Sequence, residues 1–242
     1  MPRDSQPTKE RILASAERLF ADNGFDGVSM RAIAADAKAQ LALIHYHFGT
    51  KLNVYRAIWA TRYTSEVANR REAGFAALNF NEPRPKIVRS LVELYLLPIL
   101  KMTETESLKS FVAIGAREST DPKERERGVL KEFLDDTARR FLDCFARALP
   151  ELSSADIAWG YQAMLGASVM HIADRDRITR ISNGAAKAGD GRAASEPILE
   201  FCIGGWLALA EKRRRQKHPR KAVTVSSKRE SPRRRKATAS GR

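Results

Sequence analysis

The sequence predicts an all-α protein. Apolar residues recur at spacings of three and four along most of the chain, which places them on one face of an α-helix. No stretch alternates apolar and polar residues as a half-buried strand does, and no internal repeat is visible. The length of 242 residues is sufficient for one small and one medium helical domain.

Residues 8–51 are predicted to form a small unit of three helices. Thr8 is suited to cap the first helix, and Gly24 can take the left-handed conformation that ends it. Ser29 is expected to cap a second helix that runs to about Asp36. The predicted inward face of the first helix consists of Ile12, Leu13, Ala16, Leu19 and Phe20.

A turn at residues 37–39 leads into a short third helix, from Gln40 to Tyr46. One residue of such a turn takes a left-handed conformation that suits glycine, yet Lys38 stands there. We expect the backbone at Lys38 to store strain of about 1 kcal/mol. The helical spacing allows two inward pairs in the third helix, Leu41 with Ile44 or Leu43 with Tyr46.

The chain from residue 52 to about residue 214 is predicted to be a larger helical body. Thr50 can cap its first helix, Asp121-Pro122 is a strong helix start, and Ser153 with Asp156 forms a capping box. The expected helices cover residues 53–77, 83–102 with a kink at Pro98, 105–119, 121–149, 153–173 and, opened by Pro197, 198–214, with a loop at 182–194.

The two ends of the chain differ in composition from the body. Residues 1–7 contain two prolines and no apolar pattern, so a flexible arm is expected. From Lys212 to Arg242 there are 14 Lys or Arg and one acid, Glu230, so this segment carries +13 of the formal net charge of +14. We predict a disordered basic tail over residues 215–242, which either solubilises the protein or adds non-specific affinity for DNA.

Several other classes of protein find no support in the sequence. Cys144 and Cys202 stand apart in apolar helical patterns, which predicts buried reduced thiols and no disulfide framework. His45 and His47 point to different faces of a helix, so no metal site is expected. The chain has no nucleophile motif and no phosphate-binding glycine loop, so neither an enzyme nor a cofactor is predicted. No apolar run approaches ~18 residues, so a cytoplasmic protein without a membrane partner is expected.

Residues 8–60 contain, in order, ILASAERLFADNGF, a helix start at Ser29, IAADA, and IHYHFGTK followed by an apolar helix. This ordered combination closely resembles the DNA-binding domain of the TetR family of transcriptional regulators. The resemblance implies a helix-turn-helix domain that a long helix joins to a C-terminal bundle for ligand binding and dimerisation. The sequence departs from the family pattern at Lys38, where glycine is usual, and at Leu41, Ala42 and Leu43, where small polar residues are usual.

The third helix is predicted to read base edges in the major groove. Gln40 can bond adenine bidentately, and His45 can donate or accept at a base or a phosphate. Leu41 and Leu43 either pack in the core or, with Ala42, contact thymine methyl groups. Contacts to the DNA backbone are predicted for Ser29, Lys38, Tyr46, His47, Thr50 and Lys51, those of Tyr46, His47 and Lys51 being implied by the family resemblance.

Two further sites are predicted in the body. Aromatic residues of the middle helices either fill the core or line a pocket for an apolar ligand, with Tyr63 and Arg117 as its polar groups. The last two long helices either close the monomer's core or, as the resemblance implies, pair with a second copy. The pocket candidates are Trp59, Tyr63, Tyr95, Phe111, Arg117 and Phe141, and the dimer candidates are Trp159, Met164, Val169, Phe201, Gly205, Trp206 and Leu209.

These features predict a ligand-responsive DNA-binding transcriptional regulator. The expected partners are double-stranded DNA, a second copy of the chain and an unidentified small apolar effector. As a repressor, it would bind a palindromic operator as a dimer and be released by the effector. The alternative is an architectural protein that coats DNA irrespective of sequence and is driven by its basic tail.

Overall fold

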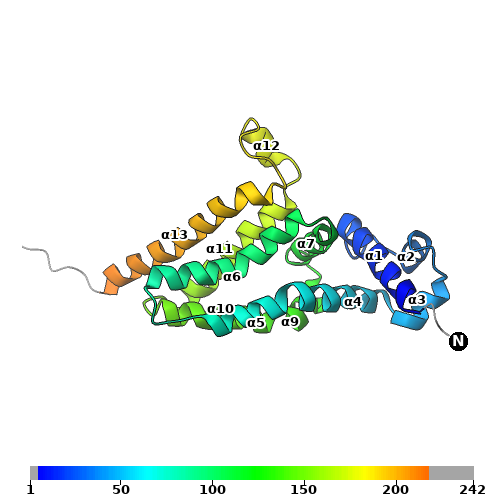
Figure 1. Ribbon diagram of the computed structural model, residues 1–242, viewed down its shortest axis with the longest axis horizontal. Coiled ribbons are helices and arrows are strands. Elements are labelled where there is room, and N and C mark those ends of the chain that lie inside the picture. The colour runs from blue at the N-terminus through cyan, green and yellow to red at the C-terminus, as the bar shows by residue number, and fades with distance from the viewer. Residues whose placement is uncertain (1–4, 218–242) are drawn as a thin grey trace, which may run out of the picture.

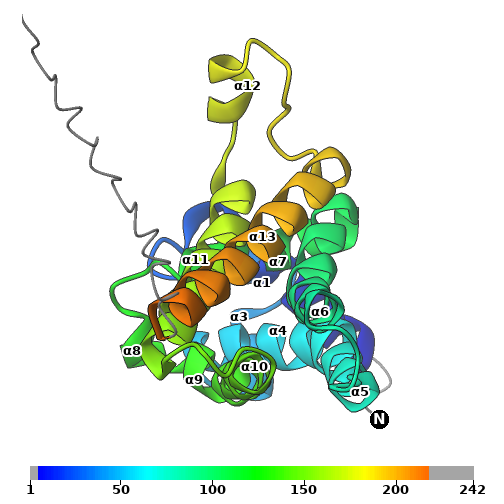
Figure 2. The ribbon, with the colours of Figure 1, turned by 90° about the vertical axis from the view of Figure 1, so that its left-hand side faces the viewer.

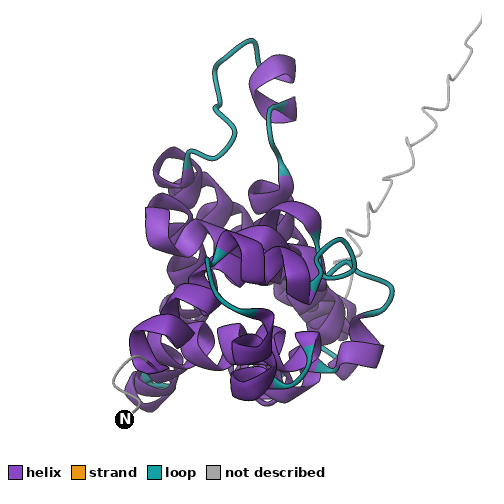
Figure 3. Cartoon of the chain, turned by 90° about the vertical axis from the view of Figure 1, so that its right-hand side faces the viewer, coloured by secondary structure: helices purple, strands orange, loops and turns teal. Residues whose placement is uncertain are grey.

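The computed structural model describes residues 5–217, and throughout this range the regular elements are helices (Figures 1 and 3). Helices α1 to α3 lie at one end of an elongated molecule, and the C-terminal end of α13 lies at the other (Figure 1). The elements are α1 Ser5–Asn23, α2 Met30–Asp36, α3 Leu41–Phe48, α4 Lys51–Tyr63, the π-helix η1 Thr64–Ala68, α5 Asn69–Ala77, α6 Arg84–Glu104, α7 Glu106–Glu118, α8 Glu124–Arg127, α9 Val129–Phe133, α10 Asp135–Ala148, α11 Ser154–Ala173, α12 Arg177–Ile181 and α13 Gly191–Lys217.

The N-terminal unit forms largely as the capping residues predict. The Ser29 hydroxyl accepts a hydrogen bond from the amide of Ala32, and α2 begins at the next residue. Lys38 takes the expected left-handed conformation, with φ 48°. Ile44 is fully buried and Leu41 packs beside it, whereas Tyr46 is 82% exposed, so the inward pair is Leu41 with Ile44. The start of α1 was predicted too late, because the helix already includes Ser5 and Thr8 lies inside it.

Helix α4 begins where the Thr50 hydroxyl accepts a hydrogen bond from the amide of Asn53. It continues through η1 into α5, so the predicted long helix exists but contains a π segment at residues 64–68. A π turn holds more residues than an α-turn, so it changes which side chains share a face.

The body departs from the predicted boundaries at two places. The single helix expected over residues 121–149 is wrong, because the chain breaks at Gly128, which has φ 69°, and again at Leu134. Helix α13 begins at Gly191 and not at Pro197, because the Asp190 carboxylate accepts a hydrogen bond from the amide of Ala193 and caps the helix. Helix α11 begins with the predicted capping box of Ser153 and Asp156.

The segment between α11 and α13 stands away from the body (Figures 1 and 2). Helix α12 ends just before the predicted loop of residues 182–194, and the chain re-enters helix at residue 191, inside that loop. Helix α12 buries none of its residues. The segment therefore adds little to the core of one chain.

Two apolar cores hold the molecule together. One joins α1, α2 and α3 to α4, α7 and α9, so the N-terminal unit shares its core with part of the body. The other lies among α5, α6, α10, α11 and α13. By length and composition alone, α13 could cross a membrane, contrary to the expectation from the apolar runs, but here it packs along α6 and α11 (Figure 2).

The predicted flexible arm and basic tail fall mostly outside the described residues. Ser5–Pro7 belong to α1 and Arg215–Lys217 to α13, which corrects the inner boundaries of both segments. Residues 1–4 and 218–242 lie outside the described range, and their predicted behaviour stays a prediction.

Candidate DNA-binding surface and effector cavity

Helix α3 presents one face to solvent and the other to the core. The exposed face carries residues that are three and four positions apart, which places them side by side on the helix: Ala42, His45 and Tyr46. Gln40 is exposed just before the helix, and its side chain makes no capping hydrogen bond. Four candidate base- or phosphate-contacting residues therefore share an accessible surface. Leu41, by contrast, is partly buried and packs against the core, which favours the core alternative of the two that the sequence allows.

The hydrogen bond of His45 fixes which ring nitrogen it offers. Its Nδ1 lies 2.9 Å from the carbonyl oxygen of Gly49, which can only accept, so Nδ1 carries a proton. In the neutral ring, Nε2 is then an acceptor, which suits the amino group of adenine or cytosine.

Two helix starts flank this surface. Ser29 and Thr50 are exposed, and each hydroxyl accepts a hydrogen bond from an amide of its own helix. The hydroxyl protons remain as donors, and the first amides of α2 and α4 add to them. This arrangement favours a phosphate of the DNA backbone at each helix start.

Lys38 is exposed in the turn between α2 and α3, where its positive φ strains the backbone. We expect Lys38→Gly to raise the free energy of unfolding by about 1 kcal/mol, measured by urea denaturation. Asn183→Gly is the matched control at the other non-glycine position with positive φ, where asparagine already tolerates this conformation. An unchanged or lowered stability of Lys38→Gly would contradict the assigned strain.

Lys51 points into the protein, which weighs against its predicted phosphate contact. Its Nζ donates to the carbonyl oxygens of Phe25 and Val28, both at 2.9 Å, and lies 4.3 Å from the centre of the Phe25 ring. Burial lowers the pKa of the Lys51 ammonium. The side chain ties the start of α4 to the loop after α1.

We expect Lys51→Met to lower the free energy of unfolding by about 1–3 kcal/mol, because two carbonyl groups lose a charged donor. Urea denaturation measures this, and Lys9→Met, at an exposed position on α1, removes the same charge as a control. The slope of DNA affinity against salt should not change in Lys51→Met. A shallower slope with unaltered stability would restore the phosphate contact.

His47 is only partly accessible. Its Nε2 is buried without a hydrogen-bond partner among the described residues, and its ring packs between those of Tyr46 and Phe48. A phosphate contact through Nε2 therefore requires movement, and that part of the prediction conflicts with the structure.

A buried ionic cluster of Tyr55, Glu118 and Arg127 lies where the body packs against the N-terminal unit, the predicted DNA reader, and we call it the reader–body joint. The Phe25 ring of the N-terminal unit contacts both Tyr55 and Arg127. The Tyr55 hydroxyl donates to Glu118 at 2.9 Å, and Arg127 Nε donates to both oxygens of the same carboxylate at 2.9 and 3.0 Å. Burial, followed by the charge of Glu118, raises the pKa of Tyr55 far above its ordinary value, so Tyr55 stays a donor. Beside the joint, Arg117 donates to the carbonyl oxygens of Ala21 and Asp22 at the end of α1.

A cavity of about 240 Å³ lies in the body between α4, α7 and α11. Its walls are mainly apolar and aromatic, which is typical of small-molecule sites. Four of the predicted pocket residues line it: Trp59, Tyr63, Tyr95 and Phe111. Arg117 does not, because it caps α1, and Phe141 packs behind the wall against Phe75 and Tyr95.

The sequence analysis missed several lining residues, of which Arg71 is the most unusual. Its side chain is 5% exposed, and it lines the cavity together with Val67, Tyr161 and Leu165. The signal was present as a spacing of four, Trp59, Tyr63, Val67 and Arg71. In an unbroken α-helix, residues four apart point in successively different directions around the axis. These four residues share a face only because η1 interrupts the α-helix, so the shared face could not be recognised from the sequence.

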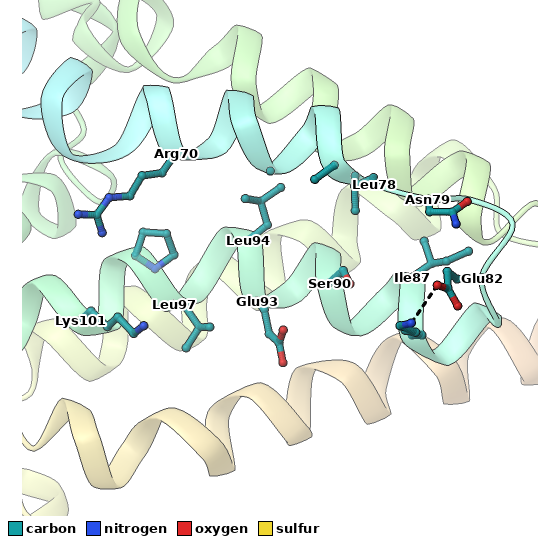
Figure 4. A pocket seen from close by; sticks show the side chains of 14 residues that line it. Arg70, Leu78, Asn79, Glu82, Ile87, Ser90, Glu93, Leu94, Leu97 and Lys101 are labelled. Carbon is teal, nitrogen blue, oxygen red and sulfur yellow. Dashed lines mark hydrogen bonds and ion pairs between the residues drawn. The ribbon is translucent and has the colours of Figure 1, made fainter.

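A second hollow, of about 590 Å³, lies between α5 and α6 (Figure 4). Arg70, Glu93 and Lys101 line it beside Leu94 and Leu97, and Lys86 pairs with Glu82 at 2.9 Å. Its walls carry charges of both signs. The groove therefore selects no evident class of ligand.

Helices α11 and α13 carry an exposed apolar surface, which we call the α11–α13 face. Trp159 is 72% exposed and Phe201 is 81% exposed, and both line a groove of about 470 Å³ that includes Gly205 and Leu209. Met164 and Trp206 also line this groove, but they are buried in the monomer's own core, where the ring centres of Trp206 and Phe145 lie 4.1 Å apart. Val169 lines the cavity. Six of the seven dimer candidates therefore line the groove, two of them as buried core residues, and Val169 lies elsewhere.

The fold and the exposed third helix define a helix-turn-helix DNA-binding protein with a helical body. Family models agree with this: residues 12–58 match the N-terminal domain described as bacterial regulatory proteins, tetR family, and residues 93–205 match a tetracyclin repressor-like C-terminal domain. The chain belongs to the TetR family of transcriptional regulators.

Individual relatives are more distant. The chain is 36% identical over 58 residues to the HTH-type transcriptional regulator UidR of Escherichia coli (strain K12), a match that covers 24% of this chain and 30% of UidR. The hemolysin II regulator HlyIIR has a similar fold, with a TM-score of 0.55 and 14% identity over 84% of this chain and 98% of that one. SmeT in complex with triclosan gives a TM-score of 0.52 and 19% identity, over 84% and 91% of the two chains.

Proposed function

We propose that this protein is a ligand-responsive repressor that binds a palindromic operator as a dimer and is released by a small apolar effector. The carrying observation is the exposed face of α3, with Gln40, Ala42, His45 and Tyr46 presented together between two helix starts. TetR-family regulators are typically ligand-responsive repressors. Such a regulator acts in the cytoplasm, on double-stranded DNA and without catalysis.

The proposed dimer forms through the α11–α13 face. Trp159 and Phe201 are large apolar side chains that a single chain leaves exposed, and a second copy would cover both. A two-fold dimer can also hold its two N-terminal units about 34–36 Å apart, the distance at which their third helices enter successive major grooves.

The proposed effector site is the cavity between α4, α7 and α11. Helix α7 contributes Phe111 and Gly115 to the cavity and then places Arg117 against α1 and Glu118 in the reader–body joint. Helix α4 likewise lines the cavity through Trp59 and reaches the joint through Tyr55. A ligand that moves either helix therefore shifts the N-terminal unit, which changes the spacing of the readers in a dimer. The complex of SmeT with triclosan supports a small effector of this kind.

Selection of bound fragments from random DNA, followed by footprinting at a stated salt concentration, tests the proposal. We expect one discrete palindrome whose half-sites lie about 10–10.5 base pairs apart, or a multiple of this. Coating of DNA without a preferred sequence would overturn the proposal and support the architectural alternative.

The basic tail is proposed to add affinity without selecting a sequence. Residues 218–242 contain nine Lys or Arg and one acid, Glu230. We expect removal of residues 218–242 to flatten the dependence of DNA affinity on salt, by about 0.9 in logarithmic slope for each phosphate that the tail neutralises in the intact protein. The preferred sequence should not change. The control is a tail of equal length with Gln at each Lys and Arg, which should behave as the deletion does, and an unaltered slope in both would contradict the prediction.

A further inference from the structure

The effector cavity contains a buried cation that lacks an anionic partner among the described residues. Arg71 is 5% exposed, and its Nε has no hydrogen-bond partner. Its Nη2 donates to the carbonyl oxygen of Tyr95 over a long 3.4 Å. Asp135 also lines the cavity, but its carboxylate pairs with Arg139 at 3.3 Å.

The π-helix η1 explains why Arg71 faces this cavity. Trp59, Tyr63, Val67 and Arg71 are four residues apart and all line it. With 3.6 residues per turn, each such step would rotate an α-helix by about 40°, so Arg71 would turn away from Trp59. The wider turn at residues 64–68 removes part of this drift. Segments of this kind occur frequently at functional sites.

The surroundings compensate the charge of Arg71 only in part. The guanidinium carbon lies 5.0 Å from the centre of the Tyr95 ring and 5.6 Å from that of Phe141, so both ring faces attract it. Such contacts are weaker than a charge-assisted hydrogen bond to a carboxylate. A buried charge without an ionic partner is costly, and a planar guanidinium matches a carboxylate bidentately.

We propose that Arg71 is the anion-recognising residue of the cavity and that the effector is a compact aromatic carboxylate. This inference rests on the proposed effector site and specifies its ligand. The cavity has a volume of about 240 Å³, and its walls carry several aromatic side chains, which favours a ligand with one or two rings. Trp59, Phe111 and Tyr161 offer aromatic walls to such rings, and the carboxylate would bond Arg71.

Binding of 2-naphthoate and its neutral analogue 2-naphthamide to the full-length protein tests the inference. Calorimetry should show that wild type prefers the carboxylate by roughly ten- to a hundredfold, the range expected for hydrogen bonds to a charged group. Arg71→Met should bind both compounds alike. The matched control is Arg70→Met, which removes the same charge from the neighbouring residue, whose exposed side chain lines the separate α5–α6 groove (Figure 4). Arg70→Met should keep the wild-type preference.

The thermal stability of the free proteins supplies the second measurement. Arg71→Met should unfold at the same temperature as wild type or higher, because an apolar side chain replaces an uncompensated charge. A marked loss of stability would assign Arg71 to the fold and overturn the inference. Equal binding of both compounds by wild type, a retained preference in Arg71→Met, or binding of neither compound would do the same. Tighter binding of decanoate than of 2-naphthoate would overturn the aromatic class.

These outcomes are separate from those of the proposed function. Operator selection uses the free protein, so it can succeed while 2-naphthoate fails, and the reverse holds as well. Loss of operator binding on addition of 2-naphthoate, in wild type and Arg70→Met but not in Arg71→Met, would connect the two.

Discussion

Replacing Glu118 with alanine is expected to lower the free energy of unfolding by about 3–5 kcal/mol. Glu118 is 2% exposed, and it is the acceptor for both Tyr55 and Arg127 in the reader–body joint. The variant leaves Arg127 buried beside only Asp121, whose carboxylate lies 3.0 Å away and is partly exposed. An uncompensated buried charge is among the most destabilising changes a single substitution makes. Urea denaturation of the full chain measures the loss.

Two further variants test whether the loss of stability comes from the unpaired buried charge of Arg127. Glu126→Ala, at an exposed position on α8, removes a carboxylate without touching the joint and should change stability little. The double variant Glu118→Leu with Arg127→Met replaces the pair by apolar groups and should recover most of the loss. If Glu118→Ala were as stable as Glu126→Ala, the joint would not hold the N-terminal unit to the body.

Replacing Phe201 with aspartate is expected to weaken dimerisation by at least about a hundredfold, as for a central interface residue. Phe201 is 81% exposed on α13, and the same chain alone gives it little to pack against. A carboxylate there would be desolvated without a partner in the proposed dimer. Sedimentation over a range of protein concentrations gives the dimer dissociation constant.

The exposed position of Phe201 keeps this test independent of folding. The variant should unfold as wild type does at concentrations where both are monomers, since it buries no charge in one chain. Ala76→Asp places the same charge at an exposed site on α5 and should leave the dimer intact. Operator affinity should fall together with dimerisation. A dimer of wild-type strength in Phe201→Asp would show that the α11–α13 face is not the interface.

Some residues of the candidate site could be predicted from the local sequence, and others could not. Gln40 is exposed just before α3, as expected for a base contact, and four of the predicted aromatic residues line the cavity. The sequence left open whether Tyr46 points inward, and the structure exposes it. Lys51 and Arg117 were predicted to contact ligands, yet their donors are used on carbonyl groups of distant segments. A charged side chain in a sequence carries no information about which backbone oxygens lie within its reach.

Lys51 and Phe25 are 26 residues apart, and Arg117 and Ala21 are 96 apart. Contacts at such separations depend on how the helices pack. The same holds for Arg71, whose burial depends on α6 and α10 and on a π segment within its own helix. The neighbours of Arg71 in the structure make it a candidate ligand-binding residue, and the neighbours of Lys51 and Arg117 weigh against that role for them.

The sequence by itself determined the features that depend on a few consecutive residues. Ser29 and Ser153 set helix starts because a hydroxyl reaches amides two or three residues ahead, and the turn after α2 forces Lys38 to a positive φ. Only the tertiary structure decided between the two faces of α3, divided residues 121–149 into three helices, and buried Arg71 without an acid. Helical periodicity allows more than one face to turn inward, and the choice follows from the apolar area that the whole fold buries.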